Sequence, residues 1–267
     1  MTEKENGVSA TQGWIDGAAL VTGGAGGLGE AVVRKLHGEG VAVVIADLAD
    51  ERAAALADEL GNKVVYLRTD VTSERDVDAA VDAAYTLGTL RHVVISHGGW
   101  GVTEKVVNRD GSPASLDGFA KTLELYLTGT YNVLRLAAAR MATNLPNDDG
   151  ERGSVVSTAS IAGYEGQIGQ SAYAAAKAGV IGLTLAGARD LSSVGIRLNT
   201  IAPGTMHTAM METVGDEALA KFRSNVPFPK RLGRPEEFAA LALHLLGNGY
   251  LNGEVVRLDG AQRFSPR

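Results

Sequence analysis

The sequence predicts an α/β fold: a single doubly wound domain with a parallel seven-stranded sheet and helices on both faces. Seven short runs rich in valine and isoleucine alternate along the chain with longer segments rich in alanine and leucine. The short runs are continuously apolar, which is typical of strands buried on both faces. Regular alternation of strand and helix gives a parallel sheet, whose ligands bind beyond the C-terminal ends of the strands.

Seven strands and six helices account for most of the chain. The apolar runs predict strands over residues 18–22, 41–46, 64–67, 92–96, 154–158, 196–201 and 254–258. The intervening segments predict helices over residues 29–38, 51–60, 74–87, 116–143, 171–194 and 235–247. One such helix separates each pair of successive strands, as a parallel sheet requires.

Two long segments interrupt this alternation, at residues 97–115 and 203–233. Both follow strand ends, so we expect both to lie over the ligand site as binding loops or lids; variable surface insertions are the alternative. We expect a lid around residues 204–233. Residues 1–14 are predicted to be a flexible tail, and residues 15–267 a single domain.

The composition excludes several classes of function. The 25 Lys and Arg residues are outnumbered by 31 Asp and Glu residues without any basic stripe, so we expect no nucleic-acid partner. There is no cysteine, and the five histidines are scattered, so we expect no disulfide, thiol nucleophile or metal site. Neither a GxSxG elbow nor a Gly-Lys pair occurs, which argues against a serine hydrolase and a P-loop protein.

The sequence also predicts a soluble, cytoplasmic protein with no membrane partner. Its N-terminus is polar and lacks an apolar signal core. The longest apolar stretch, Phe238–Leu246, is short and is interrupted by His244, so no transmembrane helix is expected.

Residues 22–29 form a glycine-rich turn between the first predicted strand and the first helix. Glycines at such a turn let the backbone approach a pyrophosphate, which free N–H groups at the helix N-terminus then bind. The run fits two spacings, GxGxxG through Gly24, Gly26 and Gly29, and TGxxxGxG through Thr22, Gly23, Gly27 and Gly29. A plain strand-to-helix turn is the alternative interpretation.

Asp47 ends the second predicted strand, 18 residues after Gly29, and favours NAD as the dinucleotide. A carboxylate at this place accepts hydrogen bonds from the adenine ribose and repels a 2′-phosphate. No Arg or Lys lies in the glycine turn or directly after Asp47, so no neighbour in the sequence offsets that repulsion. A helix N-cap is the structural alternative for Asp47, and it is compatible with this role.

Tyr173 and Lys177 form a Tyr-x-x-x-Lys pair on a predicted helix that begins near Ser171. Their spacing puts both side chains on one face. A neighbouring ammonium favours the phenolate form of tyrosine and lowers its pKa, which suits Tyr173 to exchange a proton with an alcohol or carbonyl. Ser160 lies just past the fifth strand, where its hydroxyl is able to donate to a substrate oxygen.

With these features the sequence resembles the short-chain dehydrogenase/reductase family from about Gly17 to Asp259, which implies a Rossmann fold. The matching elements are TGGAGGLG, Asp47, Asp70-Val71, Ser160 thirteen residues before Tyr173, YAAAK, Asn199 and Pro203-Gly204. The resemblance implies Ser160, Tyr173 and Lys177 as catalytic residues and no metal. It implies cofactor contacts at Gly23, Gly26, Gly27, Leu28, Gly29, Asp47, Asp70, Val71, His97, Gly98, Tyr173, Lys177, Pro203, Gly204 and Met206.

The sequence departs from the family pattern at two places. Ser96-His97-Gly98-Gly99 stands where the family has Asn-Asn-Ala-Gly, so His97 is either a spacer or a contact to the cofactor ribose. Tyr126 stands where the family has an asparagine that helps hold a water-mediated proton path to the catalytic lysine, while Asn132 matches a different, non-catalytic position. Tyr126 or water then replaces this relay, or turnover is slowed.

The C-terminal half resembles a narrower branch of the family, the type-2 3-hydroxyacyl-CoA dehydrogenases. The matching stretches are residues 157–160, 165–170, 226–229, 231–233 and 251–261. This resemblance implies an NAD-dependent oxidation of a 3-hydroxyacyl-CoA to the 3-ketoacyl-CoA, as in fatty acid metabolism. It makes Ser160, Gln167 and Tyr173 the substrate-side candidates, although a plain polar loop residue is the alternative for Gln167.

Other interpretations stay open at this point. A broader secondary alcohol or hydroxysteroid dehydrogenase fits the same motifs, and a catalytically weak NAD-binding protein fits the Tyr126 departure. The family also implies a homotetramer built through the long helices near 116–143 and 171–194 and the C-terminal strand. The stripe Ala172, Ala176, Gly179 and Leu183 allows close helix contact, or packs the helix on its own sheet.

Overall fold

Seven parallel strands form the centre of the computed structural model, which describes residues 17–99 and 101–266. The strands are β1 (Ala18–Thr22), β2 (Ala42–Asp47), β3 (Val64–Arg68), β4 (Leu90–Ile95), β5 (Gly153–Thr158), β6 (Ile196–Pro203) and β7 (Val255–Leu258). They lie in the order β3-β2-β1-β4-β5-β6-β7, each parallel to its neighbours. The chain therefore reverses its direction across the sheet between β1 and β4, and this switch point is where such sheets bind ligands.

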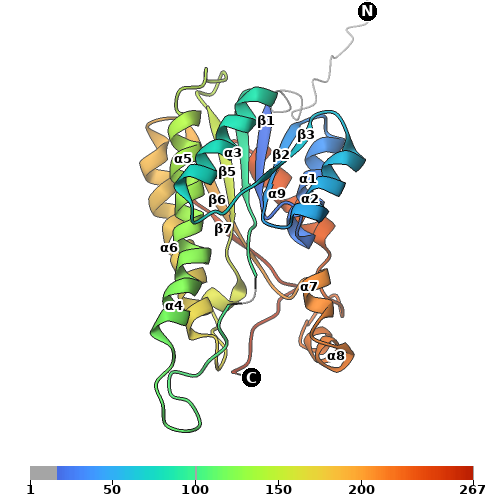
Figure 1. Cartoon of the computed structure of the whole chain (residues 1–267), viewed down its shortest axis with the longest axis vertical. Helices are drawn as coiled ribbons and strands as arrows, with labels where there is room; N and C mark the ends of the chain where they lie inside the picture. Colours follow the sequence, from blue (N-terminus) through green and yellow to red (C-terminus); the bar gives the residue numbers. More distant parts are fainter. Residues whose placement is uncertain (1–16, 100, 267) are drawn as a thin grey trace, which may run out of the picture.

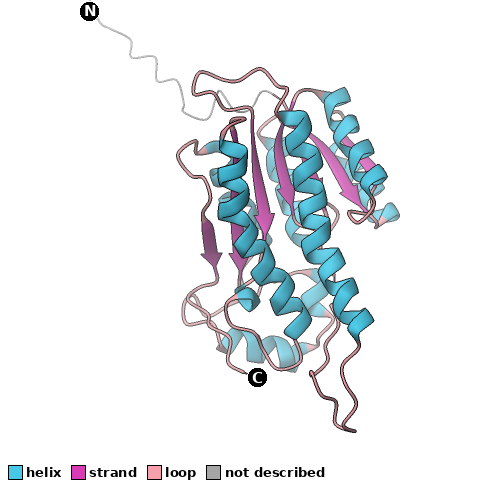
Figure 2. Ribbon diagram, turned by 90° about the vertical axis from the view of Figure 1, so that its left-hand side faces the viewer, coloured by secondary structure: helices cyan, strands magenta, loops and turns pink. Residues whose placement is uncertain are grey.

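Helices cover both faces of the sheet (Figures 1 and 2). One face packs against α3 (Glu74–Leu87), α5 (Gly129–Met141) and α6 (Ser171–Ser192). The other face packs against α1 (Gly27–Gly38), α2 (Asp50–Leu60) and α9 (Pro235–Gly247). The predicted doubly wound fold is confirmed, and the predicted strands and helices agree with the structure to within two residues at most ends. The expected tail, residues 1–14, lies outside the described residues.

The single helix expected over residues 116–143 is wrong in its middle. The segment is α4 (Leu116–Leu123), one π-helical turn η1 (Glu124–Thr128) and then α5. In the π turn the N–H of Gly129 bonds to the carbonyl of Glu124, five residues back. The displaced carbonyls find side-chain donors, since His97 Nε2 lies 3.2 Å from the Leu125 oxygen and the Thr130 hydroxyl 2.7 Å from the Tyr126 oxygen. Side-chain insertion of this kind is an established cause of a distorted helix.

The two long interrupting segments differ from one another in the structure. Residues 204–233 contain two short helices that the sequence did not predict, α7 (Ala209–Glu212) and α8 (Asp216–Ser224). Residues 101–115 instead extend beyond α4, and Figure 1 shows their tip at the opposite end of the molecule from β1. Among the described residues no helix is long and apolar enough to cross a membrane.

Arg197 on β6 joins three parts of the chain. Its guanidinium donates to the Glu151 carboxylate at 2.8 and 3.1 Å and to the carbonyls of Leu245, Leu246 and Leu251 at 2.5 to 2.8 Å. Leu245 and Leu246 lie in the last turn of α9, where carbonyls lack intrahelical partners. The buried arginine thus fixes the C-terminal end of α9 to the sheet.

We expect Arg197→Met to lower the free energy of unfolding by about 3 kcal/mol, because it leaves Glu151 and the helix carbonyls without a donor. Urea denaturation followed by circular dichroism measures this loss. Arg34→Met is the matched control, because Arg34 pairs with Glu59 on the exposed surface and is expected to cost much less. Equal losses in the two variants would contradict the role given to Arg197.

Candidate active site

A cavity of about 510 Å³ lies at the C-terminal ends of the strands. Its lining takes residues from the ends of β1, β2, β4, β5 and β6 and from the 204–233 segment. Every site residue predicted from the sequence lies on this one cavity: Gly23, Gly26, Gly27, Leu28, Gly29, Asp47, Asp70, Val71, His97, Gly98, Ser160, Gln167, Tyr173, Lys177, Pro203, Gly204 and Met206. Of the 97–115 segment, only His97, Gly98 and Gly99 are found among the described lining residues.

The glycine turn needs glycine most strictly at Gly23 and Gly29. Gly23 has φ +66°, and a Cβ there would lie 2.5 Å from the Cα of His97. A Cβ on Gly29 would lie 2.0 Å from the Gly23 oxygen. A Cβ on Gly26 has more room, with its nearest atom at 3.2 Å. Gly23 belongs only to the TGxxxGxG spacing, but Gly24, which belongs only to GxGxxG, also lacks room for a Cβ, 2.9 Å from the Val21 oxygen. The positive φ of Gly23 is the one feature that singles out TGxxxGxG.

The start of α1 fits a dinucleotide phosphate. The N-cap position is Gly26, which provides no side-chain cap, and the first turn of the helix borders the cavity. Backbone N–H groups at a helix start have no intrahelical partner and favour an anion. A side chain at Gly26 or Gly27 would occupy the space that such a group needs. These residues therefore fit the pyrophosphate of a nicotinamide cofactor.

Asp47 and Arg52 lie together at the far end of the cavity from Tyr173. The Asp47 carboxylate accepts from the N–H of Ala25 at 2.9 Å and of Ala49 at 3.0 Å, which ties β2 to the glycine turn. Arg52, on the first turn of α2, lines the same cavity and donates to the Ala25 carbonyl at 2.5 Å. Sequence reasoning missed this cation because Arg52 lies five residues beyond Asp47, and only the first turn of α2 brings its side chain back beside Asp47.

The segment after β3 is shaped by its own hydrogen bonds. The Asp70 carboxylate accepts from the N–H and hydroxyl of Thr72 at 2.9 and 2.8 Å. Asn132 on α5 donates its side-chain amide to the Val71 carbonyl at 2.9 Å. Asn132 is buried, and its contacts support the interpretation that it is a structural residue outside the reacting centre.

Tyr173, Ser160 and Lys177 meet at the end of β5. Ser160 caps a short 3₁₀ turn, η2 (Ile161–Gly163), with its hydroxyl accepting from the Ala162 nitrogen at 3.1 Å, and it lies close enough to Tyr173 to lower the pKa of that phenol slightly. Lys177 Nζ donates to the Thr158 carbonyl at 2.7 Å and lies 5.9 Å from the centre of the Tyr173 ring. One face of α6 thus brings the phenol and the ammonium to one end of the cavity.

Burial dominates the ionisation of this group. It raises the pKa of Tyr173 to about 12 and lowers the pKa of Lys177 to about 7. We expected the ammonium of Lys177 to lower the pKa of Tyr173. In the structure the loss of hydration dominates instead, because both groups are almost completely enclosed, and the pKa of Tyr173 is raised.

His97 makes specific contacts at the wall of the cavity, which Tyr126 also lines. His97 Nε2 faces the carbonyl of Leu125, which only accepts, so Nε2 carries the proton and Nδ1 accepts from the Thr22 hydroxyl at 2.9 Å. Burial lowers the pKa of His97 to about 4, so the ring is neutral. Both ring nitrogens are used within the protein, which supports the spacer interpretation of His97 over a ribose contact.

Comparisons with known proteins agree with this geometry. A family model described as Enoyl-(Acyl carrier protein) reductase matches residues 23–261. The chain is 44% identical over 249 residues to a Drosophila melanogaster protein named 3-hydroxyacyl-CoA dehydrogenase type-2, which covers 93% of this chain and 98% of the relative. The chain belongs to the short-chain dehydrogenase/reductase family of oxidoreductases.

Two further members of the family support the same assignment. A human protein named 3-hydroxyacyl-CoA dehydrogenase type-2 is 43% identical over 249 residues, which is 93% of this chain and 95% of the human one. The crystal structure of 3-hydroxyacyl-CoA dehydrogenase type-2 from Mycobacterium avium matches with a TM-score of 0.93 at 65% identity and covers 97% of this chain and 100% of that chain. The fold and the narrower resemblance predicted from the sequence are confirmed.

The C-terminal segment forms part of the cavity wall. Arg257 on β7 donates to both oxygens of Glu165 at 2.6 and 2.9 Å and to Asp259 at 2.7 Å. Arg263 then donates to Asp259 at 2.9 Å. This network carries Phe264 to the cavity wall, a contact that sequence reasoning missed. One signal in the sequence could have indicated this contact: the stretches 165–170 and 251–261 both resemble the same narrower branch of the family.

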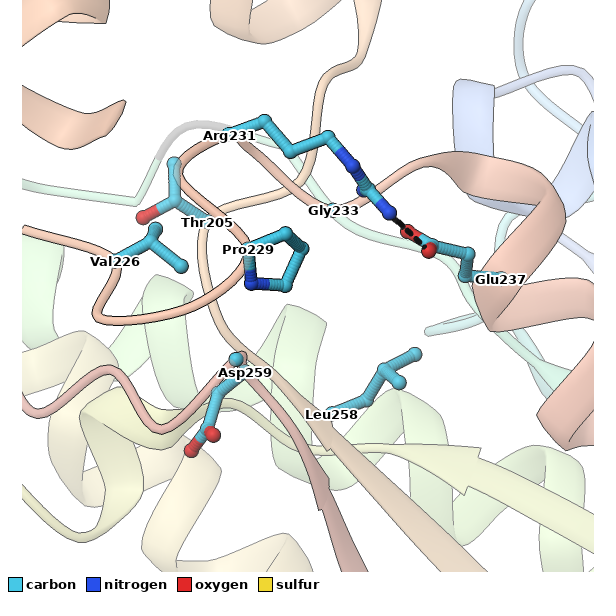
Figure 3. A pocket seen from close by; sticks show the side chains of 9 residues that line it. Thr205, Val226, Pro229, Arg231, Gly233, Glu237, Leu258 and Asp259 are labelled. Carbon is cyan, nitrogen blue, oxygen red and sulfur yellow. Dashed lines mark hydrogen bonds and ion pairs between the residues drawn. The ribbon is translucent and has the colours of Figure 1, made fainter. Parts of the chain in front are cut away.

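A smaller cavity of about 240 Å³ adjoins the main one at Thr205 (Figure 3). Val226, Pro229 and Leu258 lie around it, and Arg231 forms a two-pronged pair with Glu237 at 2.8 and 2.6 Å. The matching stretches 226–229 and 231–233 thus form the base of the 204–233 segment and are not part of its tip.

We expect Arg257→Gln to loosen the C-terminal segment and to raise the KM for substrate, because Glu165 loses its two-pronged partner and keeps only Arg263, whose Nε lies 3.7 Å away. Limited carboxypeptidase digestion, followed by mass spectrometry, measures the loosening, and steady-state kinetics measures KM. Arg263→Gln is the matched control, since Arg257 still bridges Glu165 and Asp259 in that variant. A C-terminus as resistant in Arg257→Gln as in the native protein would contradict the network's role.

Proposed function

We propose that the protein is an NAD-dependent oxidoreductase that interconverts 3-hydroxyacyl-CoA and 3-ketoacyl-CoA by hydride transfer, with Tyr173 as the general acid/base. The observation that carries the proposal is the meeting of Tyr173, Ser160 and Lys177 at one end of a cavity whose other end holds the glycine turn and Asp47. The substrate class comes from the names of the relatives, which cover nearly the whole chain at 43% and 44% identity.

The proposed reaction needs one hydride and one proton to leave the alcohol. When bound, NAD supplies the acceptor for the hydride from the carbon that bears the hydroxyl. Tyr173, as phenolate, takes the hydroxyl proton while the C–O bond becomes a carbonyl. The Ser160 hydroxyl donates to the substrate oxygen and stabilises the charge that develops there. In the reverse direction Tyr173 donates its proton to the carbonyl oxygen.

Lys177 is proposed to set the ionisation of Tyr173 and to bind the nicotinamide ribose. Because burial holds the pKa of Tyr173 near 12, the phenolate requires a nearby positive charge. Neutral Tyr173 is the form that reduces a ketone and the phenolate is the form that oxidises an alcohol. The oxidation rate therefore rises with pH, and the reduction rate falls as pH passes the same apparent pKa.

The remaining cavity residues are proposed to bind the cofactor along its length. Gly23, Gly26, Gly27, Leu28 and Gly29 hold the pyrophosphate, Asp47 the adenine ribose, Asp70 and Val71 the adenine, and Pro203, Gly204 and Met206 the carboxamide side. His97 and Gly98 form the wall between these parts, and Tyr173 and Lys177 complete the nicotinamide end. The turn geometry, the uncapped helix start and the acidic side chain support this order.

The 204–233 segment is proposed as the substrate lid of a single catalytic domain formed by residues 15–267. Its ends are paired to one another, through Gly233 N to the Thr205 carbonyl at 3.0 Å and His207 N to the Gly233 carbonyl at 2.7 Å. Its inner side reaches the glycine turn, because a Cβ on Gly27 would lie 3.0 Å from Thr208. Gln167, whose amide donates to the Ser265 carbonyl at 3.2 Å, is proposed as a substrate-side residue opposite this lid.

A broader secondary alcohol or hydroxysteroid dehydrogenase is a second candidate. The lid side of the cavity is lined by Met210, Met211, Val214 and Phe222, and the C-terminal segment adds Phe264. Such an apolar and adaptable wall suits bulky hydrophobic alcohols as well as an acyl chain. The homotetramer and the cytoplasmic location stay predictions from the resemblance and the sequence.

We expect rapid oxidation of NADH by acetoacetyl-CoA. The loss of NADH absorbance measures the rate. Tyr173→Phe should reduce turnover roughly 10²- to 10⁴-fold, because it removes the proton donor. NADH binding, measured by fluorescence, should persist in this variant. Tight NADH binding by the native protein without turnover of any carbonyl substrate would favour a catalytically weak binding protein instead.

We expect Asp47→Ala to narrow the preference for NADH over NADPH, because the repulsion of the 2′-phosphate is lost while Arg52 remains beside the site. The ratio of kcat/KM for the two cofactors measures the change. In Asp47→Ala/Arg52→Ala the gain with NADPH should be smaller than in Asp47→Ala, since the repulsion is absent in both variants but no cation meets the phosphate in the double variant. An unchanged ratio in Asp47→Ala would remove Asp47 from cofactor selection.

A further inference from the structure

Tyr126 separates Lys177 from the loop after β4. Its ring centre lies 4.7 Å from Lys177 Nζ, and its ring meets that of Tyr173 edge-on at 5.1 Å with an angle of 79° between the planes. Its hydroxyl bonds to both backbone groups of Gly99: it accepts from the nitrogen at 3.0 Å and donates to the carbonyl. The side chain is 2% exposed, so these contacts are fixed by packing.

The two departures from the family pattern form one packed unit. A Cβ on Gly98 would lie 3.3 Å from the Tyr126 ring, a contact tighter than most side chains tolerate, so glycine at this position makes room for the aromatic ring. His97 bonds to the Leu125 carbonyl and Gly99 to the Tyr126 hydroxyl. The loop and the π turn η1 therefore hold one another, and the ring cannot leave Lys177 without breaking several of these contacts.

The hydroxyl of Tyr126 is committed to Gly99, to which it donates and from which it accepts a hydrogen bond. It therefore does not substitute for an amide that relays protons to Lys177. What Tyr126 presents to Lys177 is the face of its ring, whose negative electrostatic potential attracts a cation most strongly where water is excluded.

We propose that Tyr126 is a positioning residue, whose ring face holds Lys177 as an ammonium beside Tyr173 in a site from which water has been removed. This proposal rests on the proposed function of Tyr173 as general acid/base. Burial lowers the pKa of Lys177 to about 7, and the attraction of the ring for the ammonium opposes this effect on the pKa. The ring thereby keeps a positive charge available to lower the pKa of Tyr173, which burial and, to a lesser extent, Tyr126 itself raise.

The other groups around Lys177 do not replace the ring. Thr158 on β5 offers a backbone carbonyl, and Tyr173 on α6 is itself the group to be ionised. His97, beyond β4, is neutral because burial and the charge of Lys177 both lower its pKa. From η1, among the described residues, the Tyr126 ring is the group that faces the charge of Lys177.

The experiment compares Tyr126→Leu, which removes the ring, with Tyr126→Phe, which keeps the ring and removes only the hydroxyl. The pH profile of NAD-dependent oxidation of 3-hydroxybutyryl-CoA is measured for each. In Tyr126→Leu the rising limb should move to higher pH by about one unit and turnover near neutrality should fall about tenfold, because less ammonium faces Tyr173. Tyr126→Phe should keep the apparent pKa of the native protein.

A second readout does not depend on turnover. The pKa of Lys177 is measured by NMR on lysine-labelled protein without substrate, with its signal assigned through Lys177→Arg. Tyr126→Leu should lower this pKa relative to Tyr126→Phe. If it does so while no alcohol is oxidised by the native protein, the proposed function fails and the positioning role stands.

The positioning role is overturned by either of two results. One is a pKa of Lys177 and a pH profile in Tyr126→Leu that match those of the native protein. The other is an equal shift in Tyr126→Phe and Tyr126→Leu, which would assign the effect to the hydroxyl bond with Gly99. Thermal unfolding and NADH binding check that each variant is folded, and Gly98→Ala supplies a variant that crowds the ring without removing it.

Discussion

The site depends on one close approach, between the glycine turn after β1 and the chain that leaves β4. Gly23 lacks a Cβ and has a positive φ, so the backbone of His97 passes within contact distance of it. This contact fixes the two strands at the switch point of the sheet, where a side chain would push them apart. From there His97 reaches Thr22 on one side and the π turn on the other. The position of the turn then determines where Tyr126 meets Lys177.

Enclosure gives the reacting end of the cavity little fixed charge. Tyr173 and His97 are neutral near pH 7, and the pKa of Lys177 lies near that pH. Charged side chains lie at the far end instead, with Asp47 and Arg52. A charge that does arise near Tyr173 is poorly screened there, so small changes around Lys177 have large effects on the ionisation of Tyr173. An aromatic ring is a suitable neighbour for such a lysine because it attracts the cation without adding a charge of its own.

One wall of the cavity is assembled from parts of the chain that are far apart in sequence. Glu165 follows β5 and Arg257 lies on β7, yet their ion pair holds the C-terminal segment against the cavity. Residues 204–233 leave the sheet after β6 and return to pair with their own beginning. Both segments line the same cavity. The C-terminal segment is anchored by ion pairs, and residues 204–233 by backbone hydrogen bonds.

By itself the sequence determined the doubly wound sheet, the glycine turn and the Tyr173–Lys177 pair, because strand runs, glycine spacing and helical periodicity are local patterns. It also placed every predicted site residue on one cavity, since the ends of parallel strands meet at one edge of a sheet. Only the tertiary structure decided four features: the π turn, Arg52 beside Asp47, Phe264 at the cavity wall and the ring of Tyr126 over Lys177. Each arises from contact between segments distant along the chain, and the charge of a buried group depends on that enclosure and not on its neighbours in sequence.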